Sequence, residues 1–190
     1  MNVILAFCCW LVPCMAQLTP ASNLERFQVL ADSFALDLCG QLQTYRSVSI
    51  IVEPHPARWL AEHAIVSQCA IAGIVLLAKD TFPRVHVALL DVGVSYEALS
   101  GERVRRLLRW GAVATLRLAN GQLVAFPPWQ RVESDTLPYS LLGKVDHPGY
   151  PFTTAPVPQW HSFWHTIAEP AIALVTGGVI VLLLFALRTR

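Results

Sequence analysis

The side chains best suited to metal chemistry are two histidines close to the C-terminus. His161 and His165 are four residues apart, so a helix would place them on one face, where such a pair can bind a metal ion. Glu169 is the only further ligand at helical spacing. Histidines that lie beside tryptophans at a membrane surface need no metal. We therefore predict that the chain holds neither a metal ion nor a cofactor.

A second set of residues has the chemistry of acid–base catalysis. Glu53, His55 and Asp91 lie near the ends of expected strands, but their spacing does not identify an acid–base pair. The serines lack the glycine-flanked context of a nucleophile elbow at each position considered, namely Ser33, Ser67 and Ser100. We predict a non-catalytic protein. A hydrolase or metal-dependent enzyme is the alternative, and only the scattered histidines favour it.

Three arginines follow the alternation of a single strand. Arg103, Arg105 and Arg109 fall on one side of this strand, Arg106 falls on the other, and Arg84 is expected near them. Such a row can bind an anion, a lipid headgroup or a protein partner. It can equally be a solvated face whose charges discourage strand pairing. Both interpretations stay open at this stage.

Two of the five cysteines belong to the body of the chain. Cys39 follows the apolar face of one expected helix, and Cys69 lies among the apolar residues of the next. An exported domain can join such a pair in a disulfide. Because both positions also fit a hydrophobic core, and free cysteine is among the most buried residue types, we predict two buried thiols.

The composition suggests contact with a membrane. The 190 residues are 54% hydrophobic and 14% charged, and the mean hydropathy is +0.47. The formal net charge of +1 gives no electrostatic reason to expect nucleic acid as a partner. The apolar residues concentrate at the two ends of the chain.

The N-terminal end has the pattern of an export signal. Residues 1–16 contain a short apolar core, and Cys14 and Ala16 are small residues suited to a peptidase, so cleavage is expected after Ala16. A lipid-modified Cys14 and an uncleaved anchor are the alternatives. Cleavage leaves an exported domain at residues 17–143.

The C-terminal end is expected to reach and cross a bilayer. Residues 144–166 are predicted to form a proline-rich stalk and an aromatic interface segment, residues 167–187 a transmembrane helix, and residues 188–190 a cytoplasmic tail. Ala173 and Gly177 fit the small-xxx-small pattern of helix partners. The predicted membrane-interface residues are Trp160, Phe163, Trp164, Arg188 and Arg190. This topology corresponds to a single-pass protein of the bacterial inner membrane with a periplasmic N-terminal domain.

The body of the chain alternates helical and strand patterns. Apolar residues at three- and four-residue steps predict helices at 24–38 and 57–72. β-Branched runs predict strands at 47–52, 74–78, 85–96 with a bulge at Gly93, 104–110, 113–118 and 123–126, and Asn120-Gly121 predicts a tight turn before the last of these. The expected fold class is α+β: two helices packed on one face of a mixed or antiparallel sheet, plus one C-terminal transmembrane helix.

The layout of the first half of the body resembles the small α/β domains of bacterial envelope proteins. The residues that carry the resemblance are Leu30 to Phe34, the strand Ser47 to Val52, the helix Pro56 to Ala72 and the strand at Val85. In layout they are similar to the flagellar outer-membrane assembly, TolB amino-terminal and curli-secretion (CsgG-like) domains. The resemblance implies assembly without catalysis, and the C-terminal anchor departs from those domains.

These observations together predict a single-pass envelope protein. Its exported domain is expected to bind other proteins as a non-catalytic accessory subunit or assembly factor of a membrane complex. Its expected partners are the membrane and envelope proteins, and not nucleic acid. The alternatives are the anchored enzyme and a sensor that binds a small ligand or a lipid headgroup through the arginine strand.

Overall fold

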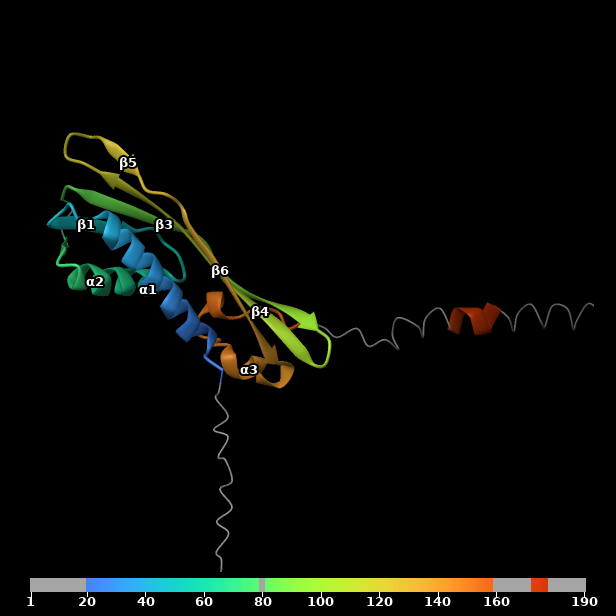
Figure 1. The fold of residues 1–190 in the computed structure, drawn as a ribbon. Helices are drawn as coiled ribbons and strands as arrows, with labels where there is room; N and C mark the ends of the chain where they lie inside the picture. The colour runs from blue at the N-terminus through green and yellow to red at the C-terminus, as the bar shows by residue number, and fades with distance from the viewer. Residues whose placement is uncertain (1–19, 79–80, 159–171, 178–190) are drawn as a thin grey trace, which may run out of the picture.

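A computed structural model describes residues 20–78, 81–158 and 172–177 of the chain (Figure 1). Helices α1 (Asn23–Gln41) and α2 (Arg58–Ile71) pack on each other and against a six-stranded mixed sheet. The strands are β1 (Ser47–Val52), β2 (Val75–Leu77), β3 (Arg84–Leu99), β4 (Arg103–Arg117), β5 (Leu123–Ala125) and β6 (Trp129–Pro138). Short 3-10 turns at Tyr139–Leu141 and Pro151–Thr153 flank α3 (Leu142–Val145). The α+β class and the mixed sheet are confirmed.

The sheet has parallel pairing at one end and antiparallel pairing at the other. β1 runs parallel to both β2 and β3, while β3 and β4 form a long antiparallel hairpin. β5 and β6 both pair with β4, each along a different part of its length. The order is therefore β2, β1, β3, β4, with β2 at one edge and β5 and β6 at the other.

Helix α1 begins at a capping box. The Ser22 Oγ accepts the Glu25 amide at 3.2 Å, and the Glu25 carboxylate accepts the Ser22 amide at 2.7 Å. These bonds satisfy two backbone donors that the first helical turn would leave unpaired. The buried face of α1 follows the predicted helical spacing through Phe27, Leu30, Phe34 and Leu38. This face packs on the sheet as the central part of the core.

The two strands predicted at 104–110 and 113–118 form one continuous strand, β4. Gly111 does not interrupt it: it pairs with Asp91 of β3, and a Cβ at this position would lie 3.4 Å from the Asp91 amide. The irregularity in β3 lies between Leu89 and Asp91 and not at Gly93, which pairs normally with Arg109. The bulge turns Leu90 outward, so the alternation of buried residues resumes in register with β4.

The hairpin at Asn120-Gly121 is confirmed. Gly121 has a φ of +84°, and the Gln122 amide donates to the Asn120 side-chain oxygen at 3.0 Å. Leu123–Ala125 then pairs antiparallel with the end of β4. The dipeptide thus supplies the left-handed backbone that a tight hairpin needs.

The first part of the segment predicted at residues 144–166 is not an extended stalk, because residues 145–153 fold back onto the domain. The preceding segment forms β6, which pairs along Arg103–Ala112 of β4. The chain then folds back onto the domain, with Val145, Phe152 and Thr153 buried. The Phe152 ring packs edge-on against Phe27 with 5.3 Å between centroids. The prolines here mark turns, such as Pro151 at the start of a 3-10 turn, because fixed φ angles serve compact turns as well as extended chain.

The C-terminal transmembrane helix is the part of the predicted fold class that needs correction. Of residues 167–187, the structure describes only a helical segment at 172–177, which contains Ala173 and Gly177. Across the described chain, no helix combines the length and the apolar character that crossing a bilayer requires. The predicted interface residues Trp160, Phe163, Trp164, Arg188 and Arg190 lie outside the described residues, as do the predicted signal peptide and cytoplasmic tail.

Candidate functional site

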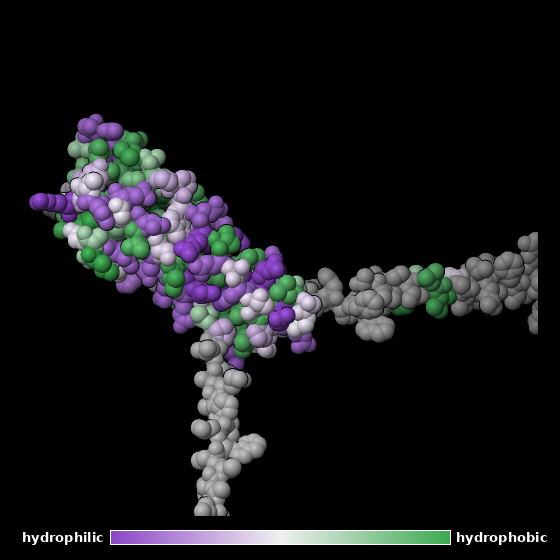
Figure 2. Space-filling view, viewed as in Figure 1, coloured by the Kyte–Doolittle hydropathy of each residue, from purple (hydrophilic) through white to green (hydrophobic). Residues whose placement is uncertain are grey.

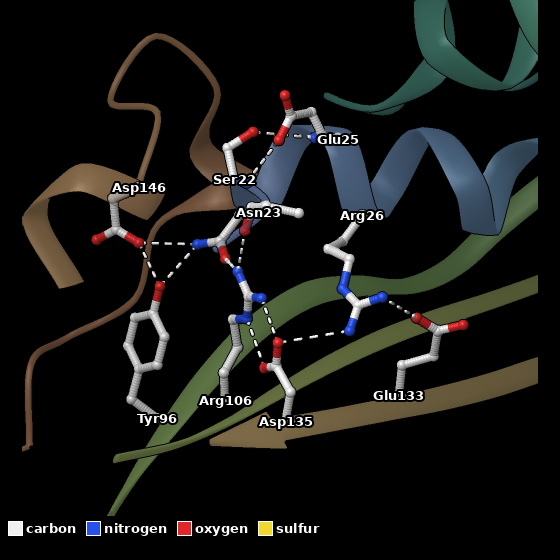
Figure 3. A network of polar contacts seen from close by, with 10 residues as sticks. Ser22, Asn23, Glu25, Arg26, Tyr96, Arg106, Glu133, Asp135 and Asp146 are labelled. Atoms are coloured by element: carbon white, nitrogen blue, oxygen red, sulfur yellow. Dashed lines mark hydrogen bonds and ion pairs between the residues drawn. The ribbon is translucent and has the colours of Figure 1, made fainter. Parts of the chain in front are cut away.

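A buried arginine is the centre of a polar network between α1 and the sheet (Figure 3). The Arg106 side chain points from β4 toward the helices and is 0% exposed. Its Nε donates to Asp135 Oδ1 of β6 at 2.8 Å, and a second guanidinium nitrogen donates to Asp135 Oδ2. Its remaining nitrogen donates to the Ala21 carbonyl at 2.8 Å and to Asn23 Oδ1 at 2.9 Å. This bidentate geometry is the favoured one for pairing arginine with a carboxylate.

Asn23 links the arginine to the C-terminal part of the domain. Its Nδ2 lies 2.7 Å from the Tyr96 hydroxyl, 2.8 Å from Asp146 Oδ1 and 2.8 Å from the Thr153 carbonyl oxygen. The Tyr96 hydroxyl in turn donates to Asp146. One side chain in the first turn of α1 therefore contacts β3, the residue after α3 and the last 3-10 turn. We call the set Asn23, Tyr96, Arg106, Asp135 and Asp146 the polar network.

The ionisation of the polar network fits a paired structural role. Burial alone would raise the pKa of Asp135, but the hydrogen bonds and charges of Arg106 and Arg26 outweigh it and hold that pKa below its ordinary value. Burial raises the pKa of Tyr96, and its hydrogen bond to Asp146 adds to the effect. At neutral pH Asp135 is charged against Arg106, and Tyr96 is a neutral donor. The network therefore joins five parts of the chain, namely α1, β3, β4, β6 and the residue after α3, and these five side chains place no activated nucleophile or base beside an open cavity.

The predicted arginine row lies on the opposite face of the sheet. Arg105 pairs with Glu97 at 3.4 Å, and Arg109 pairs with Asp91 at 3.1 Å. Arg109 also donates to the Ser95 hydroxyl at 3.0 Å. Arg103 is exposed at the start of β4. The alternation was predicted correctly, with Arg106 facing the helices, but two of the three outward arginines have carboxylate partners on β3. An anion or partner patch at Arg103, Arg105 and Arg109 stays a prediction.

The candidate acid–base residues do not converge in the part of the chain that the structure describes. His55 Nδ1 accepts the Ala57 amide at 3.0 Å in the turn before α2, and burial lowers the pKa of His55. Asp91 is held by Arg109, and no hydrogen bond or ion pair joins it to His55 or Glu53. The Ser33 hydroxyl donates to the Val29 carbonyl of its own helix. His161, His165 and Glu169 lie outside the described residues.

Sequence reasoning missed a polar groove between the two helices. This groove of about 290 Å³ is lined by Asp32 of α1, by His63 and Ser67 of α2, and by neighbouring residues. His63 and Ser67 are four residues apart on one helix, and this spacing would have revealed two of the three residues. Within the described chain no hydrogen bond joins the three side chains, so the groove lacks the contact between nucleophile and base that a hydrolase needs.

A larger hollow lies between α2 and the β2 edge of the sheet. Its volume is about 420 Å³, and its lining is apolar except for Glu62, which pairs with Arg58. Exposed apolar side chains continue beyond the hollow: Ile71 of α2 is 78% exposed, and Val75 of β2 is 58% exposed. Val66 of α2, at the hollow itself, is 55% exposed. Figure 2 shows hydrophobic residues at the surface of the domain, interspersed with hydrophilic ones, including at the end that carries α2 and β1. The residues that line the hollow are Ile50, Glu62, Ile65, Val66, Leu76, Leu77 and Ala78.

Comparison with known proteins gives little further information. No family model matches the chain, and no curated protein matches it. One solved structure, a minor lipoprotein from Acinetobacter baumannii, is similar to 50% of this chain and 70% of its own, with 16% sequence identity and a TM-score of 0.35.

Proposed function

We propose that this protein is a non-catalytic, protein-binding accessory subunit or assembly factor of the bacterial cell envelope. The envelope location rests on the export signal expected at residues 1–16. The observation that carries protein binding is the uncharged, apolar β2 edge with its adjacent hollow. The ligand that fits it is an extended, uncharged segment of a partner protein, added to the sheet as a further strand.

The β2 edge supplies backbone groups for such an addition. β2 pairs only with β1 among the described strands, and the Val75 amide donates to the Arg46 carbonyl on the β1 side. Because successive residues of a strand direct their backbone groups to opposite edges, those of Leu76 are directed to the free edge. An added strand gains affinity from these hydrogen bonds and specificity from the pockets for alternate side chains. The hollow beside Leu76 is such a pocket.

The opposite edge of the sheet differs in charge. On β6, Arg131, Glu133 and Asp135 alternate on the side that faces α1, where Arg26 lies 3.9 Å from Glu133 and 3.4 Å from Asp135. Inward-pointing charges protect an edge strand from pairing with another chain, since a misplaced partner would bury them. Residues 74–78 carry no charged side chain. This contrast in charge favours β2 as the docking edge and an uncharged segment as its occupant.

The test measures binding of a short fluorescent peptide in which valine and threonine alternate, with lysines at its ends for solubility. Fluorescence anisotropy gives the affinity of the full chain in mild detergent, and amide chemical shifts map the site. We expect shifts at residues 46–52 and 74–78, and a loss of affinity of at least about tenfold in the double variant Val75→Lys/Leu77→Lys. The matched control is Val132→Lys on β6, where an exposed apolar residue occupies the charged edge. Equal affinity in both variants, or shifts confined to β6, would contradict the proposal.

A further inference from the structure

The thiols of Cys39 and Cys69 lie against each other inside the domain. Cys39 belongs to α1 and is 1% exposed, and Cys69 belongs to α2 and is 0% exposed. Both are free thiols, which confirms the prediction made from their positions. The two side chains are close enough to shift each other's pKa. The Cys39 Sγ also lies 4.0 Å from the carbonyl oxygen of Ile65, one helical turn before Cys69.

This contact results from the packing of the two helices. α1 and α2 pack closely against each other, and Cys39 continues the buried face that contains Phe34, Ala35 and Leu38. A disulfide needs two sulfurs near each other and Cα atoms no more than about 7 Å apart. The first condition is supported by the packing of the two helices and by the position of the Cys39 sulfur one helical turn from Cys69. Closing the bond then requires adjustment of two small side chains within the helix pair.

We propose that Cys39 and Cys69 close into an intrachain disulfide while the chain folds, by exchange with a disulfide-containing oxidant. One cysteine thiolate attacks the oxidant, forming a mixed disulfide and releasing one of the oxidant's sulfurs as a thiolate. The second cysteine thiolate attacks the protein sulfur of the mixed disulfide and expels the other. Two protons and two electrons leave the protein, and the oxidant disulfide becomes two thiols. Glutathione disulfide is a suitable oxidant of this class.

The burial of the pair determines when this exchange takes place. Contact with Cys69, together with burial, raises the pKa of Cys39, while the same contact lowers the pKa of Cys69. Because both side chains are buried, an oxidant does not reach either sulfur in the folded domain. Exchange is therefore fast while the chain folds and slow afterwards, in both directions. A disulfide formed during export would be protected from later reduction, and a chain folded under reducing conditions would keep its thiols.

The disulfide would tie the C-terminal end of α1 to the last turns of α2. In the chain-entropy model, closing a loop of roughly thirty residues raises the folding equilibrium constant by about 500-fold. α2 also supplies Ile65 and Val66 to the hollow beside β2. The redox state of the pair would therefore change the local stability of α2, which forms one wall of the hollow, whether or not that hollow binds a partner.

The experiment uses the full chain with Cys8, Cys9 and Cys14 replaced by serine, so that only the two body cysteines remain. The chain is refolded in mild detergent with either reduced glutathione or glutathione disulfide. It is then acid-quenched, denatured without reductant and labelled with polyethylene-glycol maleimide. We expect two labels after reduced refolding and none after oxidised refolding, with an intact mass lowered by two hydrogens.

A single-cysteine variant, Cys39→Ala, is the matched control. It has no partner for Cys69, so oxidised refolding should leave a glutathione adduct on Cys69 and no cross-link. Two labels, or two glutathione adducts, after oxidised refolding of the two-cysteine chain would overturn the proposal. A second readout is the urea midpoint, which should be higher for the oxidised chain. An equal or lower midpoint would refute the stabilising geometry argued from the helix contact.

Discussion

Replacing Asp135 with alanine should destabilise the domain far more than the loss of an ordinary ion pair. Arg106 is fully buried and would lose both of its contacts with the carboxylate, keeping only the Ala21 carbonyl and Asn23 Oδ1. Removing one partner of a buried pair costs about 3–5 kcal/mol, because the remaining charge is left uncompensated. The Asp135 side chain is 26% exposed, so water partly replaces it. We therefore expect a loss of about 3 kcal/mol in the free energy of unfolding, at the low end of that range.

The matched control is Glu97→Ala on the other face of the same sheet. Glu97 pairs with Arg105 at 3.4 Å, and the side chains are 52% and 50% exposed. Exposed pairs of this kind contribute about 0.2–1 kcal/mol, since water screens both charges before and after the change. The two variants remove the same chemical group from neighbouring parts of one sheet. Their difference therefore isolates the effect of burial.

Urea unfolding at neutral pH measures both variants. Far-UV circular dichroism follows the helices, and tryptophan fluorescence, to which buried Trp110 contributes, follows the tertiary packing. Coincident transitions would support two-state analysis. If Asp135→Ala and Glu97→Ala lowered the free energy of unfolding by the same amount within about 0.5 kcal/mol, Arg106 could not be a desolvated cation that depends on Asp135. An Asp135→Asn variant, which keeps the shape without the charge, should fall between them.

Two further predictions concern the polar network. The pKa of Asp135 is lower in the folded domain than in the unfolded chain, so the stability that the charged carboxylate contributes is present at neutral pH and is lost as the pH falls below about 4. The difference in the free energy of unfolding between wild type and Asp135→Asn, measured by urea titration at several pH values, should therefore narrow below that pH. A difference that stays constant with pH would contradict the pairing of Asp135 with Arg106. Asn23→Ala leaves Tyr96, Asp146 and the Thr153 carbonyl without a shared donor and should cost about 1–3 kcal/mol. Hydrogen exchange should then accelerate in the turn at residues 150–154, and unchanged exchange there would mean that Asn23 does not hold this segment.

The elements that were predicted from the sequence are those with strong local signals. The α1 helix is marked by the Ser22 cap and by apolar residues at helical spacing, and the Asn120-Gly121 turn needs a backbone conformation that few dipeptides supply. Both signals lie within a few residues of the structure that they specify. The alternation around Arg106 was equally local, and it correctly separated this arginine from the other three.

The parts that were missed depend on contacts between distant residues. Asn23 and Thr153 are 130 positions apart, and Arg106 and Asp135 are 29 apart on strands that pair only after folding. No periodicity shows that an arginine will be buried, because its burial depends on a carboxylate from another strand. The incorrect prediction of a stalk has the same cause. Proline content indicates restricted backbone angles, but distant contacts, such as that of Phe152 with Phe27, decide whether the segment extends or folds back.

The polar network also brings the two ends of the domain together at the start of α1. Arg106 holds the Ala21 carbonyl, and Asn23 contacts the Thr153 carbonyl, so the first described residues and the last 3-10 turn are fixed beside the start of α1. Helix α1 has 19 residues and is about 28 Å long, and β1 lies toward its far end (Figure 1). β2 pairs with β1 at that far end. A partner strand added to β2 would therefore meet the domain at the end remote from Ala21 and Thr153.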